Sequence, residues 1–372
     1  MCMIAGYAGP DRAAPILIGM LRKMEYFDGG RSTGIATVHE GKLYTAKING
    51  NLDRFLEETN GADLPGTVGI IHSRTDDNLA SHAHPFLSDD DKLALVLNGT
   101  MRDVNTDEFY DTSNAIMQDF FDRGFKIRTQ WDVPESRGAN RRLKNGKGYH
   151  DSEPYALMVG EYMAKHPEMS PEQSIEAGFA DALSRLPGDI VVLGVQADLP
   201  DTITVGTVTR PMHWANADGA SYLATCPIAM PEAAQNSAVL GIPTCTVARV
   251  TSKGIWFSGR KPENVQAEQI DMRVSALIYT RLEALLQGKK DEPLSMYDFP
   301  TYTGWRDIWN EPYVECRFKK DTGLLKPYAA AVYQALWNFY TEGRLHMVMG
   351  ERKGHPITKF WLGEAADGNT RT

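Results

Sequence analysis

Residues 1–9 have the sequence MCMIAGYAG. Residues 3–9 are apolar or small, which is typical of a buried strand. Cys2 follows the initiator methionine, and because cysteine is small we expect Met1 to be removed. Cys2 would then carry both its thiol and a free α-amine. The thiolate is the reactive form of cysteine, and an α-amine of pKa about 7.7–8.0 can accept its proton, so this one residue supplies a nucleophile and a base.

An Asn-Gly pair, Asn98-Gly99, follows the apolar stretch Leu93–Leu97. An asparagine amide and a glycine N–H at the end of a strand can donate together to a tetrahedral oxyanion. Donors of this kind contribute about 3–4 kcal/mol each. The alternative is an ordinary Asn-Gly turn, which is common.

Two charged residues are candidates for binding the ends of a zwitterionic substrate. Arg74 ends the strand predicted from Val68, and its planar guanidinium suits a carboxylate. Asp151 precedes a helical pattern that begins at Pro154, where it could cap the helix or bind an ammonium group. We expect His84 to support this site structurally, because His82 and His84 have no third ligand at a spacing suited to a metal.

The alternation of apolar runs and helical patterns predicts a sheet-on-sheet core covered by helices on each side. The expected strands are 3–8, 34–38, 42–48, 68–71, 93–97, 190–195, 202–207, 222–224 and 246–250, and the expected helices are 13–24, 106–123, 154–165 and 171–186. The polar, basic segment Glu135–Lys147 is expected to be a loop or insertion.

The character of the chain changes near residue 260. Helices are predicted at 268–286 and 328–342, followed by a hairpin of 345–349 and 357–362 around Glu351–His355. A helix followed by a basic-tipped hairpin fits a winged helix, and it equally fits a helical packing or oligomerisation module. The tryptophans and tyrosines of this region are candidates for a docking surface, although aromatic residues at helical spacing more often belong to a core: Trp305, Trp309, Tyr328, Tyr333, Trp337, Tyr340 and Trp361.

The composition is that of a globular protein of two or three domains, with 372 residues, 42% hydrophobic and 23% charged. A net charge of -9 makes nucleic acid an unlikely partner and favours small-molecule substrates. The apolar runs are too short to span a bilayer and no leader pattern is recognised, so we expect a cytoplasmic protein with no membrane contact. Cys226, Cys245 and Cys316 show no spacing typical of metal sites or disulfides and are expected to be buried small hydrophobes.

Taken together and in this order, these residues resemble the glutaminase domain of glucosamine-6-phosphate synthase and its class II, N-terminal nucleophile amidotransferase relatives. The opening MCMIAGYAG is similar to the family's Met-Cys-Gly-Ile-Val-Gly, and residues 14–26 are similar to its following helix. The resemblance covers roughly residues 2–260. Further similar segments are 32–36, 69–74, 83–85, 97–99, 151–153, 200–203 and 222–225.

The resemblance implies an α+β fold, the four-layered αββα sandwich of N-terminal nucleophile hydrolases, in residues 2–260. A smaller, mainly helical module would then form residues 261–372. It implies Cys2 as the nucleophile, with Asn98 and Gly99 as the oxyanion hole. Arg74 would bind the α-carboxylate of glutamine and Asp151 its α-ammonium group. His72 and His84 belong to matching motifs and are included in the substrate site, and neither a metal nor an organic cofactor is needed.

The chain departs from the family pattern directly after Arg74. Residues 75–79 are Thr-Asp-Asp-Asn-Leu, where the family has Trp-Ala-Thr-His-Gly, so the residues that help to close the glutamine pocket are not recognisable. Met3 replaces a usual glycine, residues 27–32 replace Arg-Gly-Tyr-Asp-Ser, and residues 129–148 look inserted. These departures leave the identity of the amide substrate more open than that of the nucleophile.

The favoured function is therefore hydrolysis of L-glutamine to glutamate and ammonia, with the ammonia delivered to a separate synthase subunit, because the last hundred or so residues are too few for a sugar-isomerase domain. One alternative is an amidase of the same fold that acts on another amide. Another is a non-catalytic, ligand-sensing regulator whose C-terminal module binds nucleic acid through Arg352 and Lys353. The partner and the oligomeric state, including a homo-oligomer, stay open.

Overall fold

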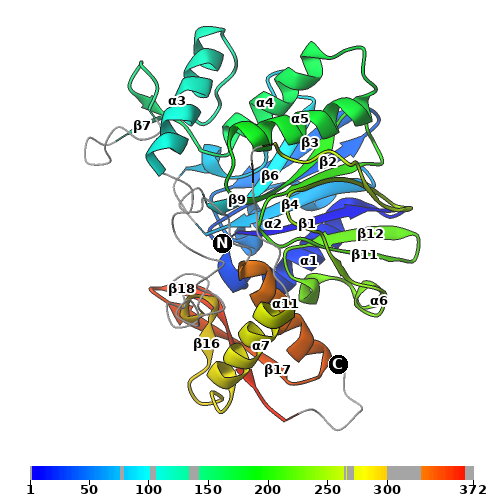
Figure 1. The fold of residues 1–372 in the computed structure, drawn as a ribbon, viewed down its shortest axis with the longest axis vertical. Helices are drawn as coiled ribbons and strands as arrows, with labels where there is room; N and C mark the ends of the chain where they lie inside the picture. Colours follow the sequence, from blue (N-terminus) through cyan, green and yellow to red (C-terminus); the bar gives the residue numbers. More distant parts are fainter. Residues whose placement is uncertain are drawn as a thin grey trace.

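Two antiparallel sheets form the centre of the molecule (Figure 1). The computed structural model describes residues 2–75, 79–100, 106–133, 142–263, 265, 272–299 and 328–364. The first sheet has the order β13-β11-β12-β1-β4-β2-β3 and the second the order β15-β14-β10-β9-β6-β5. Their strands are β1 (Met3–Ala8), β2 (Ser32–His39), β3 (Lys42–Ile48), β4 (Val68–Arg74), β11 (His213–Ala217), β12 (Ala220–Ala224) and β13 (Leu240–Gly241) in the first, and β5 (Phe86–Leu87), β6 (Leu93–Thr100), β9 (Asp189–Gln196), β10 (Ile203–Thr207), β14 (Thr246–Thr251) and β15 (Gly254–Phe257) in the second.

The inner faces of the two sheets share one apolar cluster. Side chains alternate between the faces of a strand, so every second residue of β1, β4 and β6 points into this cluster. In β1 these are Ile4 and Ala8, in β4 Val68 and Ile70, and in β6 Ala94 and Val96. Continued along each strand, the same alternation brings Cys2, His72, Arg74 and Asn98 to the inner faces at one end of the sandwich.

Helices cover the outer face of each sheet. Met3, Ala5 and Tyr7 of β1 pack on α1 (Ala13–Asp28). Leu93, Leu95 and Leu97 of β6 pack with residues of α4 (Glu153–Lys165) and α5 (Pro171–Arg185). Because β1 is buried on both faces, all its residues are apolar or small. The predicted α+β class is confirmed.

Three further α-helices and a two-stranded ribbon complete residues 2–260. They are α2 (Leu52–Glu58), α3 (Thr106–Asp122), α6 (Glu232–Gln235) and a ribbon of β7 (Trp131–Asp132) with β8 (Lys147–Gly148). The predicted loop of 135–147 therefore ends in a strand, while residues 134–141 lie outside the described part. Strands β11 and β15 were not predicted, since neither has a long apolar run.

The C-terminal part holds a small sheet as well as helices. Helices α7 (Met272–Leu286) and α11 (Tyr328–Thr341) accompany a three-stranded sheet of β16 (Leu294–Ser295), β18 (His355–Leu362) and β17 (Leu345–Arg352). The predicted hairpin is confirmed and is longer than expected. In the described part of the module, β16 adds a third strand to the predicted hairpin, and the mainly helical character of the whole module stays a prediction.

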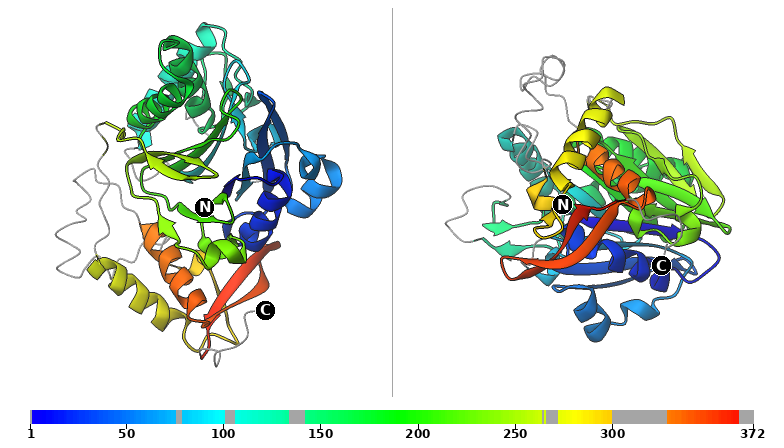
Figure 2. Two further views of the ribbon diagram at one scale, coloured as in Figure 1. Left: turned by 90° about the vertical axis from the view of Figure 1, so that its right-hand side faces the viewer. Right: turned by 90° about the horizontal axis from the view of Figure 1, so that it is seen from below.

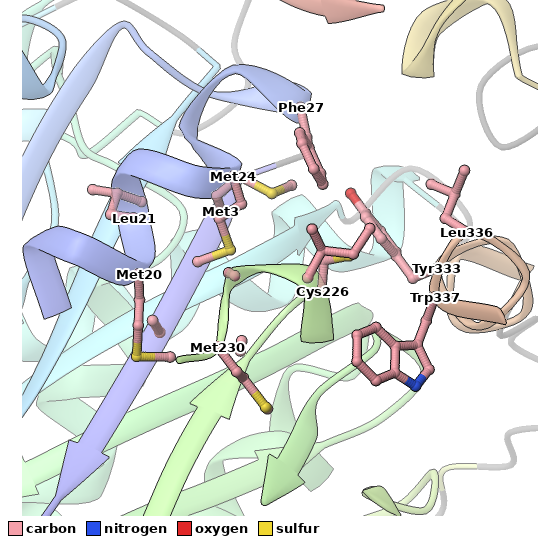
Figure 3. Packing of buried hydrophobic residues seen from close by; sticks show 14 of the residues in the cluster. Met3, Met20, Leu21, Met24, Phe27, Cys226, Met230, Tyr333, Leu336 and Trp337 are labelled. Carbon is pink, nitrogen blue, oxygen red and sulfur yellow. The ribbon is translucent and has the colours of Figure 1, made fainter. Parts of the chain in front are cut away.

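The C-terminal elements pack on α1, and Figure 2 shows the β17–β18 hairpin beside that helix. The ring centroids of Phe27 and Phe360 lie 5.1 Å apart. Tyr333 and Trp337 are buried in the same cluster as Met3 and Met24 (Figure 3). The apolar core therefore continues across residue 260, and the domain boundary placed there stays a prediction.

The docking-surface interpretation is wrong for Tyr333 and Trp337, because both side chains are buried in the core. Tyr340 and Trp361 are partly buried, whereas Trp305, Trp309 and the side chain of Tyr328 lie outside the described residues. Cys226 is buried as expected. Cys245 is only partly buried, which corrects its assignment as a core residue, and Cys316 lies outside the described part.

Among the described residues, no helix is both long enough and apolar enough to cross a bilayer.

Candidate active site

Cys2 and Asn98 meet across the two sheets at the start of β1. The backbone nitrogen of Cys2 donates to Oδ1 of Asn98 at 3.0 Å. This contact joins residues that are 96 positions apart in the sequence, and it fixes which side of the Asn98 amide faces Cys2. The predicted nucleophile and the predicted oxyanion donor are thus brought together.

The side chain of Asn98 is fully buried, and only one of its two polar atoms makes a hydrogen bond within the described part of the chain. While its Oδ1 accepts the bond from Cys2, its Nδ2 has no hydrogen-bond partner among the described residues. An unsatisfied buried amide donor costs about 1–3 kcal/mol, so such a donor usually has a hydrogen-bond partner. A bound ligand could supply that partner here. This donor belongs to the same amide group that binds the backbone of Cys2, so it lies close to the predicted nucleophile.

Gly99 is required by close packing. A Cβ atom at this position would lie 2.3 Å from the carbonyl oxygen of Asp189 and 2.7 Å from Cα of Ile190. Both are atoms of the neighbouring strand β9 and cannot move aside easily. The structure therefore explains the glycine by the close approach of β6 and β9, and its role as an oxyanion donor stays a prediction.

The Cys2 thiol lies in an environment with opposing effects on its pKa. Burial raises the pKa of the thiol, while the positive charges of the N-terminus and of Arg74 lower it, as does a hydrogen bond from the backbone of Thr75. The burial effect is the largest, so the pKa of Cys2 is raised overall. A thiol with a raised pKa needs a nearby base, and the α-amine of the same residue would provide one.

Arg74 stands at the end of β4, next to the position of Cys2 in the neighbouring strand. Its Nη1 donates to the carbonyl oxygen of His82 at 3.2 Å, and its own carbonyl accepts from the backbone nitrogen of Arg31 at 3.0 Å. The guanidinium is partly exposed and lies on the Cys2 side of the sandwich. Two acidic neighbours in the sequence, Asp76 and Asp77, lie outside the described residues.

Asp151 lies in a turn before α4, and its two predicted roles, helix cap and ammonium ligand, both stay predictions. The N-cap of α4 is Ser152, with no side-chain cap hydrogen bond. One carboxylate oxygen of Asp151 instead lies 3.2 Å from Nδ1 of His150. The carboxylate is partly exposed and therefore accessible to a ligand.

Histidines fill the space behind the site. The rings of His72 and His84 stack at 3.8 Å, and His150 lies 5.8 Å from His84 and 5.3 Å from His82. Burial lowers the pKa of His72 to about 3, so its ring is neutral, and its Nε2 donates to the carbonyl oxygen of Leu97 at 3.2 Å. His72 thus ties β4 to the residue that precedes Asn98. No group of three or more His, Cys, Asp or Glu residues in the described part could hold a metal.

Lys47 is a supporting residue that sequence reasoning missed. It is largely buried, which lowers its pKa to about 8, and its Nζ donates to the carbonyl oxygens of Ala83 at 2.9 Å and Pro85 at 3.2 Å. These bonds hold the segment that carries His84 against β3. Gly34 on β2 permits this packing, because a Cβ there would lie 2.0 Å from the carbonyl oxygen of His84.

Tyr333 is a second missed residue, and it comes from the C-terminal helix α11. Its side chain is fully buried, and its hydroxyl has no hydrogen-bond partner among the described residues. Burial raises the pKa of Tyr333 well above its usual value, and Asp28 and the thiols of Cys226 and Cys2 raise it further. Figure 3 shows the hydroxyl directed toward the α1 and β1 side of the core. The C-terminal part therefore reaches the surroundings of Cys2.

Comparison with known proteins finds similarity to glutamine aminotransferases and amidotransferases. No family model matches the chain. Glutamine–fructose-6-phosphate aminotransferase (isomerizing) of Thermosynechococcus vestitus is 29% identical over 263 residues, which are 68% of this chain and 36% of that protein. The protein of the same name from Leifsonia xyli subsp. xyli is 29% identical over 264 residues, with the same shares. The chain spans about a third of the length of these curated relatives.

Solved structures show the same fold. Glutamine phosphoribosylpyrophosphate amidotransferase from B. subtilis, complexed with ADP and GMP, superposes with a TM-score of 0.51 at 17% identity, covering 75% of this chain and 52% of that chain. These findings confirm the predicted resemblance: the chain is similar in sequence to glutamine–fructose-6-phosphate aminotransferases and in fold to a glutamine phosphoribosylpyrophosphate amidotransferase. Both sequence relatives described above carry the name glutamine–fructose-6-phosphate aminotransferase (isomerizing).

Proposed function

We propose that this chain hydrolyses L-glutamine to glutamate and ammonia through Cys2 as an N-terminal nucleophile. One observation carries the proposal: Asn98 accepts a hydrogen bond from the backbone nitrogen of Cys2, and its buried amide donor has no partner within the described part of the chain. The similarity in sequence to glutamine–fructose-6-phosphate aminotransferases supports glutamine as the substrate. The order of helices and sheets supports the four-layered αββα arrangement implied by the same resemblance.

The reaction would begin after removal of Met1. The α-amine of Cys2 takes the thiol proton, and the thiolate attacks the side-chain amide carbon of glutamine. Nδ2 of Asn98, with the backbone N–H of Gly99, stabilises the oxyanion of the tetrahedral intermediate. The protonated amine then gives its proton to the leaving nitrogen, and ammonia departs from a γ-glutamyl thioester. Water, deprotonated by the same amine, attacks the thioester and releases glutamate and the thiol.

Other residues would bind the substrate or position the catalytic groups. Arg74 is assigned to the α-carboxylate, because its positive charge acts on the Cys2 thiol from a partly exposed position. Asp151 is assigned to the α-ammonium group, because its partly exposed carboxylate lies beside His150 of the histidine cluster. His72 and His84 are assigned to positioning, since both are buried and His72 is committed to the carbonyl of Leu97. Their contribution would be the correct spacing of β4 and β6 rather than proton transfer.

We expect Arg74→Lys to raise the KM for glutamine about 10- to 100-fold with a much smaller change in kcat. Lysine keeps the charge but loses the two parallel bonds of the guanidinium, and hydrogen bonds to charged groups contribute about 1.5–3 kcal/mol each. Steady-state ammonia release measures both constants. Arg22→Lys, which changes an exposed arginine paired with Asp53, is the matched control. An unchanged KM would remove Arg74 from the substrate site.

The identity of the amide is tested by the same assay. The chain differs from the family pattern at residues 75–79, which motivates the alternative of another amide substrate. We expect glutamine to have a higher kcat/KM than asparagine, glutamate γ-methylamide and simple aliphatic amides. If another amide is hydrolysed faster than glutamine, the N-terminal nucleophile assignment stands and the substrate assignment changes.

We infer that the ammonia is used outside residues 1–372 by a separate synthase subunit. The aligned segment covers only 36% of the aminotransferase relatives, and in this chain it is succeeded by the small C-terminal sheet with helices α7 and α11. Ammonia released from glutamine would be lost to solvent unless a second active site used it. Co-purification of a synthase whose ammonia-dependent reaction becomes glutamine-dependent on addition of this chain would support the inference.

A further inference from the structure

A cavity of about 190 Å³ lies between the end of α1 and the tip of the β17–β18 hairpin. Its wall includes Tyr26, Asp28, Gly29 and Arg31 from one side and Tyr297, Arg352, Lys353 and His355 from the other. The cavity therefore forms only where the C-terminal part meets the class II amidotransferase fold. It is separate from the proposed glutamine site, whose residues do not line it.

The charge around this cavity is mainly positive. Arg31, Arg352 and Lys353 contribute cations, and Asp28 is the one lining carboxylate among the described residues. The Asp28 carboxylate accepts a hydrogen bond from the Tyr297 hydroxyl, and this bond uses one of the lone pairs of the carboxylate. Within the described part of the chain, Arg352 and Lys353 form no ion pair. Two of the three cations thus keep their charge available to a ligand.

The Arg352 side chain is held in place by an aromatic ring. Its guanidinium carbon lies 3.8 Å from the centroid of the Tyr297 ring. Stacking of this kind uses the face of the guanidinium and leaves the N–H groups at its edge free to donate. The ring therefore orients the guanidinium without using its N–H groups. Those N–H groups can donate to a planar anion such as a carboxylate or to a tetrahedral one such as a phosphate.

The segment that forms one wall also borders the proposed catalytic residues. Gly30 donates its N–H to the hydroxyl of Ser73 at 2.8 Å, and Arg31 donates its N–H to the carbonyl of Arg74 at 3.0 Å. The charge of Asp28 acts on the Cys2 thiol. Arg31, which lines the cavity, is therefore joined to Arg74 by one backbone hydrogen bond.

We propose that this cavity is a binding site for a small anion that carries a phosphate or carboxylate group, held by Arg31, Arg352 and Lys353. The volume admits a small metabolite and excludes a polymer. Phosphate and carboxylate share the geometry that an arginine fork recognises, so both belong to the proposed ligand class. Binding does not depend on glutamine hydrolysis and goes beyond the proposed function.

The test is titration calorimetry of the full chain with inorganic phosphate and, separately, with glutarate, in the absence of glutamine. We expect at least one probe to bind, and the double variant Arg352→Ala, Lys353→Ala to weaken that binding at least about tenfold. Both side chains are exposed, so the variant should fold normally, which its thermal unfolding midpoint checks. The charge-matched control is Arg185→Ala, Lys165→Ala, on helices α5 and α4.

The result identifies the ligand chemistry as well as the site. Tighter binding of phosphate points to a phosphate ester, and tighter binding of glutarate points to a carboxylic acid. Failure of both probes to bind, or equal binding by the double variant and the unaltered chain, would overturn the proposal. Because the titration contains no glutamine, a chain without glutaminase activity could still bind the anion, and an active glutaminase could still fail to bind it.

Discussion

Replacing Cys2 with alanine is expected to reduce glutamine hydrolysis by about 10⁴-fold or more, since removal of a catalytic nucleophile has effects of this size. The variant keeps the α-amine and the hydrogen bond from the backbone nitrogen to Asn98, so only the thiol is lost. Cys2→Ser tests the same point with a smaller change, because a hydroxyl ionises far less readily than a thiol. Ammonia release under saturating glutamine is the measurement.

Cys226 offers the matched control for this experiment. It is buried near the start of β1, and burial raises the pKa of its thiol to about 12, so it stays protonated at neutral pH. Cys226→Ala is therefore expected to retain glutaminase activity, apart from any loss of stability from the vacated volume. A Cys2→Ala chain as active as the unaltered one would contradict the proposed mechanism.

Replacing Asn98 with aspartate is expected to lower kcat about 10²- to 10³-fold, which is the usual effect of losing one oxyanion donor. Aspartate keeps an oxygen that can accept from Cys2 and puts a second oxygen where the unpartnered Nδ2 stands. That oxygen repels the negative charge of the tetrahedral intermediate. KM should change less than kcat, because the lost bond forms only as the oxyanion develops.

The control for this variant is Asn145→Asp, which places the same change in an exposed turn. A complementary variant, Asn98→Ala, removes the acceptor and the donor together and should lower kcat at least as much. If Asn98→Asp folds normally and its kcat stays within about threefold of the unaltered chain, the oxyanion must be stabilised by other groups.

Much of the site could be predicted because the alternation of side chains along the strands and the order of the family motifs indicate the same residues. The apolar patterns of 3–8, 68–71 and 93–97 predict strands, and the period of two then places Cys2, His72 and Asn98 on faces shared with apolar residues. The pattern alone does not indicate which strands face each other across the sandwich. The resemblance supplied that information, and the bond between Cys2 and Asn98 agrees with it.

Lys47 and Tyr333 could not be predicted from local patterns. Lys47 lies on a strand among half-exposed residues, where a lysine normally points to solvent, and its burial depends on the distant segment 81–85. Tyr333 has the spacing of a core residue on a helix, and nothing near it in the sequence indicates that its hydroxyl approaches α1 and β1. Both depend on contacts between segments far apart in the chain, which periodicity does not encode.

Residues 75–79, which differ from the family pattern, limited the prediction of the substrate. Sequence reasoning identified Arg74 and noted that its neighbours differ from the family pattern, but residues 76–78 lie outside the described part. The position of the Arg74 guanidinium depends on β4 and on its bond to His82. Kinetics with different amides therefore tests how residues 75–79 affect substrate choice.

The proposed mechanism requires Cys2 to be a free N-terminal nucleophile in a site shaped for glutamine. Intact-protein mass spectrometry before and after treatment with a diazoketone analogue of glutamine tests it most directly. We expect a chain that lacks Met1 and gains one adduct, mapped to Cys2 and prevented by excess glutamine. A chain that retains Met1, or one in which Cys2 stays unlabelled while another cysteine reacts, would contradict the claim.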